Sequence, residues 1–185
     1  MTDQFRFSLT DQEKEALKDL VRLAIAQRLF PKENITLPSA PSAAMSKHLG
    51  AFVTLKSQGK LRGCIGHVVG DKPLWDTVAE MAQAAAFDDS RFAPLDPGEF
   101  DALELEISIL SPLVECPDPT LVEVGRHGLL LHHAGRSGLL LPQVPVEWRW
   151  DRETFLTQIC HKAGLPGDTW RESGAMLFWF EAEVF

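Results

Sequence analysis

Three segments of the chain carry apolar residues at the three- and four-residue spacing of an amphipathic helix. The first opens with Thr10 and Glu13, which have the spacing of a capping box. Asp71 precedes the second as a candidate N-cap, and Gly164 follows the third, where a left-handed residue commonly ends a helix. We therefore predict three helices, over residues 10–30, 73–86 and 151–163.

Other segments show the two-residue alternation or the short apolar runs that are typical of β-strands. Residues 103–110 alternate most regularly. Leu105 and Ile107 fall on one face and Glu104 and Glu106 on the other, so we expect the glutamates to face solvent. The other predicted strands are residues 49–56 and 61–69 joined by a turn at 57–60, two apolar runs joined by a turn at 135–138, and the C-terminal segment 175–185.

The helices alternate with hairpins rather than with single parallel strands. This order favours an α+β fold with a mainly antiparallel or mixed sheet flanked by helices. At 185 residues, the chain is expected to form a two-lobed single domain over residues 1–185, with a smaller lobe around residues 112–150. The expected core includes Leu17, Leu20, Leu55, Ile65, Leu105, Ile107 and Phe180.

The charge of the chain narrows the range of expected partners. The net charge is −8 at pH 7 and the basic residues are scattered, which argues against a nucleic-acid or anionic-membrane surface. No apolar run approaches the roughly 20 residues that span a bilayer. Three cysteines and a polar N-terminal segment without signal-peptide character predict free thiols and a cytoplasmic location.

Residues 61–66, with the sequence LRGCIG, place unusual residue types in a predicted strand. Strand geometry directs Arg62, Cys64 and Gly66 to one face and Gly63 to the other. On the first face, the Arg62 cation would favour the Cys64 thiolate, and Gly66 would leave open space beside it. Gly63 would let a neighbouring element approach closely. The alternative is structural, with Cys64 as a small buried apolar residue and the glycines marking a bulge.

Histidines elsewhere in the chain could act with Cys64. His127 or His161 could serve as the base of a cysteine nucleophile, because such partners are usually distant in sequence. The alternative for each is a structural, hydrogen-bonded role. Cys64 and His67 face opposite sides of a regular strand, so they could not ligate one ion, and we predict no metal site.

The segment DDSRF follows the second predicted helix and presents Asp89, Ser90 and Arg91 in irregular structure. One interpretation is a loop that offers Arg91 to an anionic ligand. The other is a loop that is fixed by pairing of Asp89 with Arg91. The candidate substrate-binding residues are therefore Arg62, Gly63, Gly66, Asp89, Ser90 and Arg91.

LRGCIG resembles the signature of the AMME-syndrome chromosomal-region (AMMECR) domain family. Four further segments are similar to blocks of that family and occur in the same order: FDDSRFAPL (87–95), RHGLLL (126–131), LLPQV (140–144) and KAGLP (162–166). The resemblance covers nearly the whole chain and indicates the prokaryotic type called AmmeMemoRadiSam system protein A. His67 departs from the pattern, in which a small polar residue is expected.

The resemblance implies a cleft lined by LRGCIG, together with Memo-like and radical-SAM proteins as possible partners, but it implies no established reaction. Our first hypothesis is an enzyme or catalytic accessory that uses the Cys64 thiolate, with Arg62 binding an anionic group. The second is a non-catalytic protein that binds a small molecule or another protein at LRGCIG. Neither needs a cofactor. The first requires Cys64 to be an acidic thiol, unlike Cys116 and Cys160.

Overall fold

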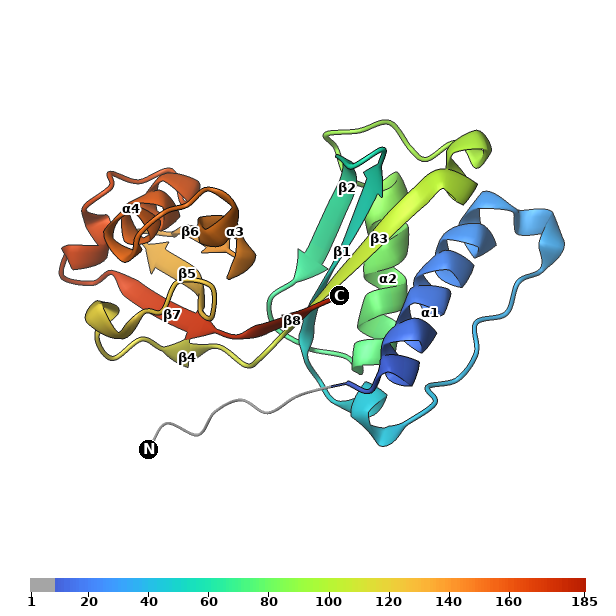
Figure 1. Ribbon diagram of the computed structural model, residues 1–185, viewed down its shortest axis with the longest axis horizontal. Coiled ribbons are helices and arrows are strands. Elements are labelled where there is room, and N and C mark those ends of the chain that lie inside the picture. Colours follow the sequence, from blue (N-terminus) through green and yellow to red (C-terminus); the bar gives the residue numbers. More distant parts are fainter. Residues whose placement is uncertain (1–8) are drawn as a thin grey trace. The chain divides into compact units, whose positions relative to one another are not determined.

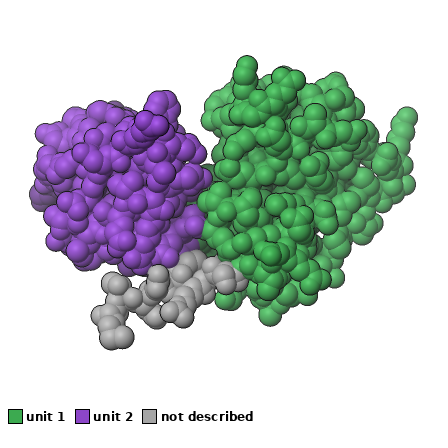
Figure 2. Space-filling model, viewed as in Figure 1, with its two compact units in different colours: residues 1–110, 183–185 green, residues 111–182 purple. Residues whose placement is uncertain are grey.

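The computed structural model describes residues 9–185 and divides them into two compact units. The first unit contains the described residues up to Leu110 together with Glu183–Phe185, and the second contains Ser111–Ala182 (Figure 2). Each unit combines helices with one antiparallel sheet, so the predicted α+β class is confirmed. The predicted cleft stays a prediction.

The first unit is a four-stranded sheet with two helices on one side (Figure 1). Its strand order is β2-β1-β3-β8, so β2 is an edge strand. Helix α2 packs against β1 and β2, and α1 packs against α2. The elements are α1 (Asp11–Leu29), β1 (Gly50–Ser57), β2 (Lys60–His67), α2 (Leu74–Phe87), β3 (Leu103–Leu110) and β8 (Ala182–Val184).

The core of the first unit follows the predicted pattern closely. Leu17, Leu20, Leu55 and Ile107 are fully buried, whereas Ile65 and Leu105 are only half-buried at the margin of the cluster. Glu104 is exposed and Glu106 is half-exposed, which confirms the register of β3. The capping box of Thr10 and Glu13 forms at the start of α1. Asp71, by contrast, does not cap α2, because the N-cap position is taken by Pro73.

The second unit is a four-stranded sheet in the order β4-β7-β5-β6 with α4 packed against β5 and β6. Its core contains Leu129, Leu131, Phe155 and Ile159, all fully buried. The unit extends to Ala182, beyond the expected lobe at 112–150, because α4 and β7 supply much of this core. Its elements are β4 (Val114–Glu115), β5 (Gly128–His133), β6 (Arg136–Leu140), α3 (Gln143–Glu147), α4 (Arg152–Lys162) and β7 (Met176–Phe180).

Both predicted hairpins form, each with a two-residue turn. Gln58 and Gly59 connect β1 to β2, and both have positive φ, as the right-handed twist of a tight hairpin requires. The second turn uses Ala134 and Gly135 and so lies earlier than the predicted turn at 135–138. The sequence pattern favoured Gly138 as a turn residue, but this glycine lies inside β6 because it packs against the backbone of α4.

The C-terminal segment corrects one prediction. It forms two strands rather than one: β7 belongs to the second sheet, and β8 is an edge strand of the first. Phe180 is buried as expected, but it belongs to the second unit. Between the two strands, the Ser111 N–H donates to the carbonyl of Glu181, and the Glu181 N–H donates to the Ser111 hydroxyl, both at 2.9 Å. The Glu181 carboxylate accepts from Arg126 at 2.8 Å.

Candidate functional site

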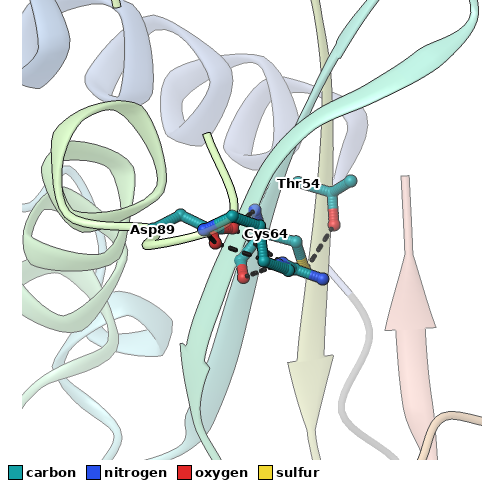
Figure 3. A network of polar contacts seen from close by, with 4 residues as sticks. Thr54, Cys64 and Asp89 are labelled. Carbon is teal, nitrogen blue, oxygen red and sulfur yellow. Dashed lines mark hydrogen bonds and ion pairs between the residues drawn. The ribbon is translucent and has the colours of Figure 1, made fainter. Parts of the chain in front are cut away.

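The candidate site centres on Cys64 in the edge strand β2. Gly63 faces helix α2, because a Cβ at this position would collide with the carbonyl oxygen of Ala85. Cys64 points to the opposite face, where the hydroxyl of Thr54 donates to its Sγ at 3.3 Å (Figure 3). The predicted alternation of faces is therefore confirmed. Gly63 has the predicted role of admitting a neighbouring element.

The backbone of Cys64 is bonded by two side chains of the segment that follows α2. Its N–H donates to Oδ2 of Asp89 at 2.9 Å, and its carbonyl accepts from Nη2 of Arg91 at 3.1 Å (Figure 3). Both groups point away from β1. Thr54 and Cys64 are therefore a non-hydrogen-bonded cross-strand pair, in which side chains approach most closely. This register explains why the thiol meets the Thr54 hydroxyl.

Asp89 and Arg91 are also paired with each other, as the second interpretation of DDSRF predicted. Arg91 donates from Nε to Oδ1 of Asp89 at 2.9 Å and from Nη2 to Oδ2 at 2.7 Å. The Asp89 carboxylate is almost fully buried. Its hydrogen bonds to Arg91, with a smaller contribution from the Cys64 N–H, hold its pKa well below the usual range. Ser90 between them is exposed.

Arg62 has a different partner from the expected one. Its guanidinium forms a two-point ion pair with Glu99, from Nε at 2.7 Å and from Nη2 at 2.9 Å. The Arg62 side chain is 14% exposed. The hydrogen bonds from Arg62, followed by one from the Asp96 N–H, lower the pKa of Glu99 to about 2. The charge that was expected to activate the Cys64 thiol is thus balanced by a carboxylate.

The ion pair of Arg62 with Glu99 makes the free energy of unfolding depend on pH in a defined range. Because the pKa of Glu99 falls from 4.5 to about 2 on folding, its contribution is complete above about pH 4.5 and is lost as the pH falls through about 2. We expect the difference in urea midpoint between wild type and Glu99→Gln to be constant near neutrality and to shrink in that range. A difference that stays constant down to pH 2 would contradict the assignment.

The open space expected beside Gly66 is absent. Phe52 is the cross-strand partner of Gly66, and a Cβ on the glycine would collide with the Phe52 ring. The ring therefore covers the glycine, an arrangement by which aromatic residues compensate for glycine in a sheet. Gly66 makes room for Phe52 and not for a ligand, which corrects the prediction.

Both candidate histidines belong to the second unit. His127 is buried, its Nδ1 accepts from the backbone N–H of Glu123 at 3.0 Å, and its ring lies 4.5 Å from that of Trp179. Burial lowers the pKa of His127 and favours the neutral ring. His161 is exposed near the end of α4. Pairing of either histidine with Cys64 stays a prediction.

The other two cysteines are half-buried or buried in the second unit. Burial raises the pKa of both Cys116 and Cys160, as expected for structural thiols. Within residues 9–185, no three His, Cys, Asp or Glu side chains gather in a way that could hold a metal ion. No helix in this described part of the chain is long and apolar enough to cross a membrane.

One pair on the Cys64 face was not found from the sequence. Lys56 donates to Glu106 at 2.7 Å, and Glu106 is the cross-strand neighbour of Thr54 on the side away from Cys64. The sequence pattern placed Glu106 on a solvated face but carried no signal for its partner. Cys64, Thr54 and Glu106 thus form a row across three strands.

These features define a class of protein: a two-unit α+β chain whose edge-strand cysteine is fixed by the segment after α2. The AMMECR1 family model matches residues 18–185, and the chain belongs to this family. It is 40% identical over 183 residues to a protein of Methanothermobacter thermautotrophicus, and the aligned region covers 96% of this chain and 95% of the relative. It is 42% identical over 189 residues to protein TK0174 of Thermococcus kodakarensis, covering 97% and 92%.

The fold is also similar to a solved structure. The crystal structure of the uncharacterised protein PH0010 from Pyrococcus horikoshii matches with a TM-score of 0.88 at 38% identity. The match covers 96% of this chain and 93% of that one. The comparison supports the fold and the family, and the function is argued from the geometry of the site.

Proposed function

We propose that the chain is a non-catalytic binding protein that uses the sheet face around Cys64 to bind a partner protein. The observation that carries the proposal is the two-point ion pair of Arg62 with Glu99. Arg91 is likewise paired with Asp89, and Lys56 with Glu106. An anionic substrate would have to displace a carboxylate from each cation. The face instead offers the Cys64 side chain and the Thr54 hydroxyl.

We further propose that the partner belongs to an AmmeMemoRadiSam system, in which this chain is the A protein of a cytoplasmic assembly. Membership of the AMMECR1 family and the five ordered sequence blocks support this assignment. The candidate partners are the Memo-like and radical-SAM proteins of such a system. A small molecule bound by one of those proteins would then meet the Cys64 face only within the complex.

Thiolate catalysis is the second candidate, and one observation favours it. Nη2 of Arg91 donates to the Cys64 carbonyl at 3.1 Å, so this guanidinium lies beside the Cys64 residue. Arg91 therefore replaces Arg62 as the cation on which thiolate catalysis would depend. The first function remains preferred because the Arg91 guanidinium already makes two hydrogen bonds to Asp89 and one to the Cys64 carbonyl.

Calorimetric titration of the purified chain against each candidate partner tests the proposed function. We expect one partner to bind, and Cys64→Ser to bind within about threefold of wild type, because serine keeps a hydrogen bond to Thr54. Wild type alkylated at Cys64 with N-ethylmaleimide should bind at least about tenfold more weakly, since the adduct covers the face.

The matched control is Cys64→Ser treated with the same reagent, which reports any effect of alkylation at Cys116 or Cys160. It should bind like the untreated variant. Absence of binding to both partners, or equal binding by alkylated and untreated wild type, would contradict the proposed function.

A further inference from the structure

At Cys64, the outer edge of β2 is bonded by side chains instead of by a strand. In a strand, the N–H and C=O of one residue point to the same side, and successive residues alternate. At an edge, every second residue therefore presents an unpaired donor and acceptor that can pair with another chain. In β2, which is an edge strand, Cys64 is such a residue, yet both its groups are bonded to Asp89 and Arg91.

The residues that follow Asp89 and Arg91 in the chain make further contacts with β2. Nη2 of Arg62 reaches the carbonyl of Pro94 at 3.5 Å in addition to the carboxylate of Glu99. The Phe92 ring lies near both guanidinium groups, 6.0 Å from that of Arg62 and 5.6 Å from that of Arg91. Residues 88–99, which we call the strap, thus contact both Arg62 and Cys64 of β2.

The strap is held in place by the core and by α2, so it does not depend on β2 alone. Leu95 is 4% exposed within the hydrophobic cluster, and its N–H donates to the carbonyl of Ala86 at 2.9 Å. At its start, Asp88 forms a two-point ion pair with Arg28 of α1, but both side chains are about half exposed, so this pair contributes little. Leu95 is therefore the anchor that fixes the strap beside the edge strand.

We propose that the strap protects the edge of β2 from adding a strand of a second copy of the chain. Asp89 supplies the acceptor and Arg91 the donor that a neighbouring strand would otherwise supply to Cys64. Exposed edges that lack such cover are the usual sites of edge-to-edge association. This role concerns the backbone of Cys64 and is independent of what its thiol does.

The full-length variant Asp89→Ala tests the strap, with Asp88→Ala as its matched control. Each change removes a carboxylate that pairs with an arginine, but only Asp89 contacts β2. In hydrogen exchange followed by mass spectrometry, we expect the β2 amides of Asp89→Ala to exchange at least about tenfold faster, with α1 unchanged. In sedimentation velocity, this variant should form concentration-dependent dimers, whereas the control stays like wild type.

Arg91→Lys keeps the proposal testable if Asp89→Ala does not fold. It leaves the Asp89 acceptor and a positive charge beside this buried carboxylate, so the fold should persist, but lysine lacks the planar fork that donates to both Asp89 and the Cys64 carbonyl. It should also self-associate more than Asp88→Ala. If the foldable variants match Asp88→Ala in both β2 exchange and sedimentation, the strap does not protect the edge and the proposal is wrong.

Discussion

Gly63→Ala is expected to destabilise the first unit by about 3 kcal/mol, near the upper end of the range for overpacked positions. The added methyl group would meet the carbonyl oxygen and carbon of Ala85. These atoms belong to the backbone of α2, so a side-chain rotation cannot relieve the collision. Either α2 or β2 must shift, and both contribute to the same core. Urea unfolding followed by hydrogen exchange of α2 and β2 peptides would measure the loss for this unit separately.

The matched control is Gly98→Ala. At this glycine, an added methyl group meets only a side-chain oxygen of Asp96 at 3.3 Å, so the change should be close to neutral. Equal stability of Gly63→Ala and Gly98→Ala would show that β2 does not lie against α2 as described.

Arg62→Ala is expected to produce the second-largest effect, a loss of about 2 kcal/mol in the free energy of unfolding. Hydrogen bonds to charged groups contribute about 1.5–3 kcal/mol, and the partial exposure of Glu99 reduces the effect. The variant leaves the Glu99 carboxylate without its two guanidinium donors and uncovers the Phe92 ring. The unfolding free energy of the first unit is the quantity to measure.

Arg28→Ala is the control for Arg62→Ala, because it removes an arginine that also forms a two-point pair with a carboxylate. Its side chain is 46% exposed, and exposed pairs contribute about 0–1 kcal/mol. Arg62→Lys should lie between wild type and Arg62→Ala, since lysine keeps the charge but not the two-point geometry. If Arg62→Ala is no less stable than Arg28→Ala, the ion pair with Glu99 does not have the structural role described.

Local sequence signals predicted much of the fold because they depend on neighbouring residues. Capping by Thr10, the turn at Gly59 and the alternation of β3 are all set within a few positions. The division of the C-terminal segment into β7 and β8 was not predictable in this way. That segment is apolar except for Glu181 and Glu183, and which of its residues joins which sheet is decided by distant partners, such as the bonds of Glu181 to Ser111.

The same limit applies to the candidate site. Period-two geometry placed Cys64 and Gly63 on opposite faces correctly, because alternation is a local property. It could not show that Glu99 would neutralise Arg62 or that Phe52 would cover Gly66. Each of these contacts joins residues that are separated by at least 14 positions in the chain. The position of Arg62 two residues before Cys64 therefore did not predict the charge that surrounds the thiol in the fold.

Alkylation of Cys64 by iodoacetamide in the native wild-type protein at pH 7 tests most directly whether this residue belongs to a binding surface. Peptide mapping separates its reaction from those of Cys116 and Cys160. The proposed binding function predicts a rate constant no higher than that of a free peptide with the sequence of residues 60–67. An activated nucleophile would react at least about tenfold faster, because one unit of lowered thiol pKa gives about tenfold more thiolate. Such a rate, falling in Arg91→Ala, would contradict the binding account and establish Cys64 as a reactive thiol.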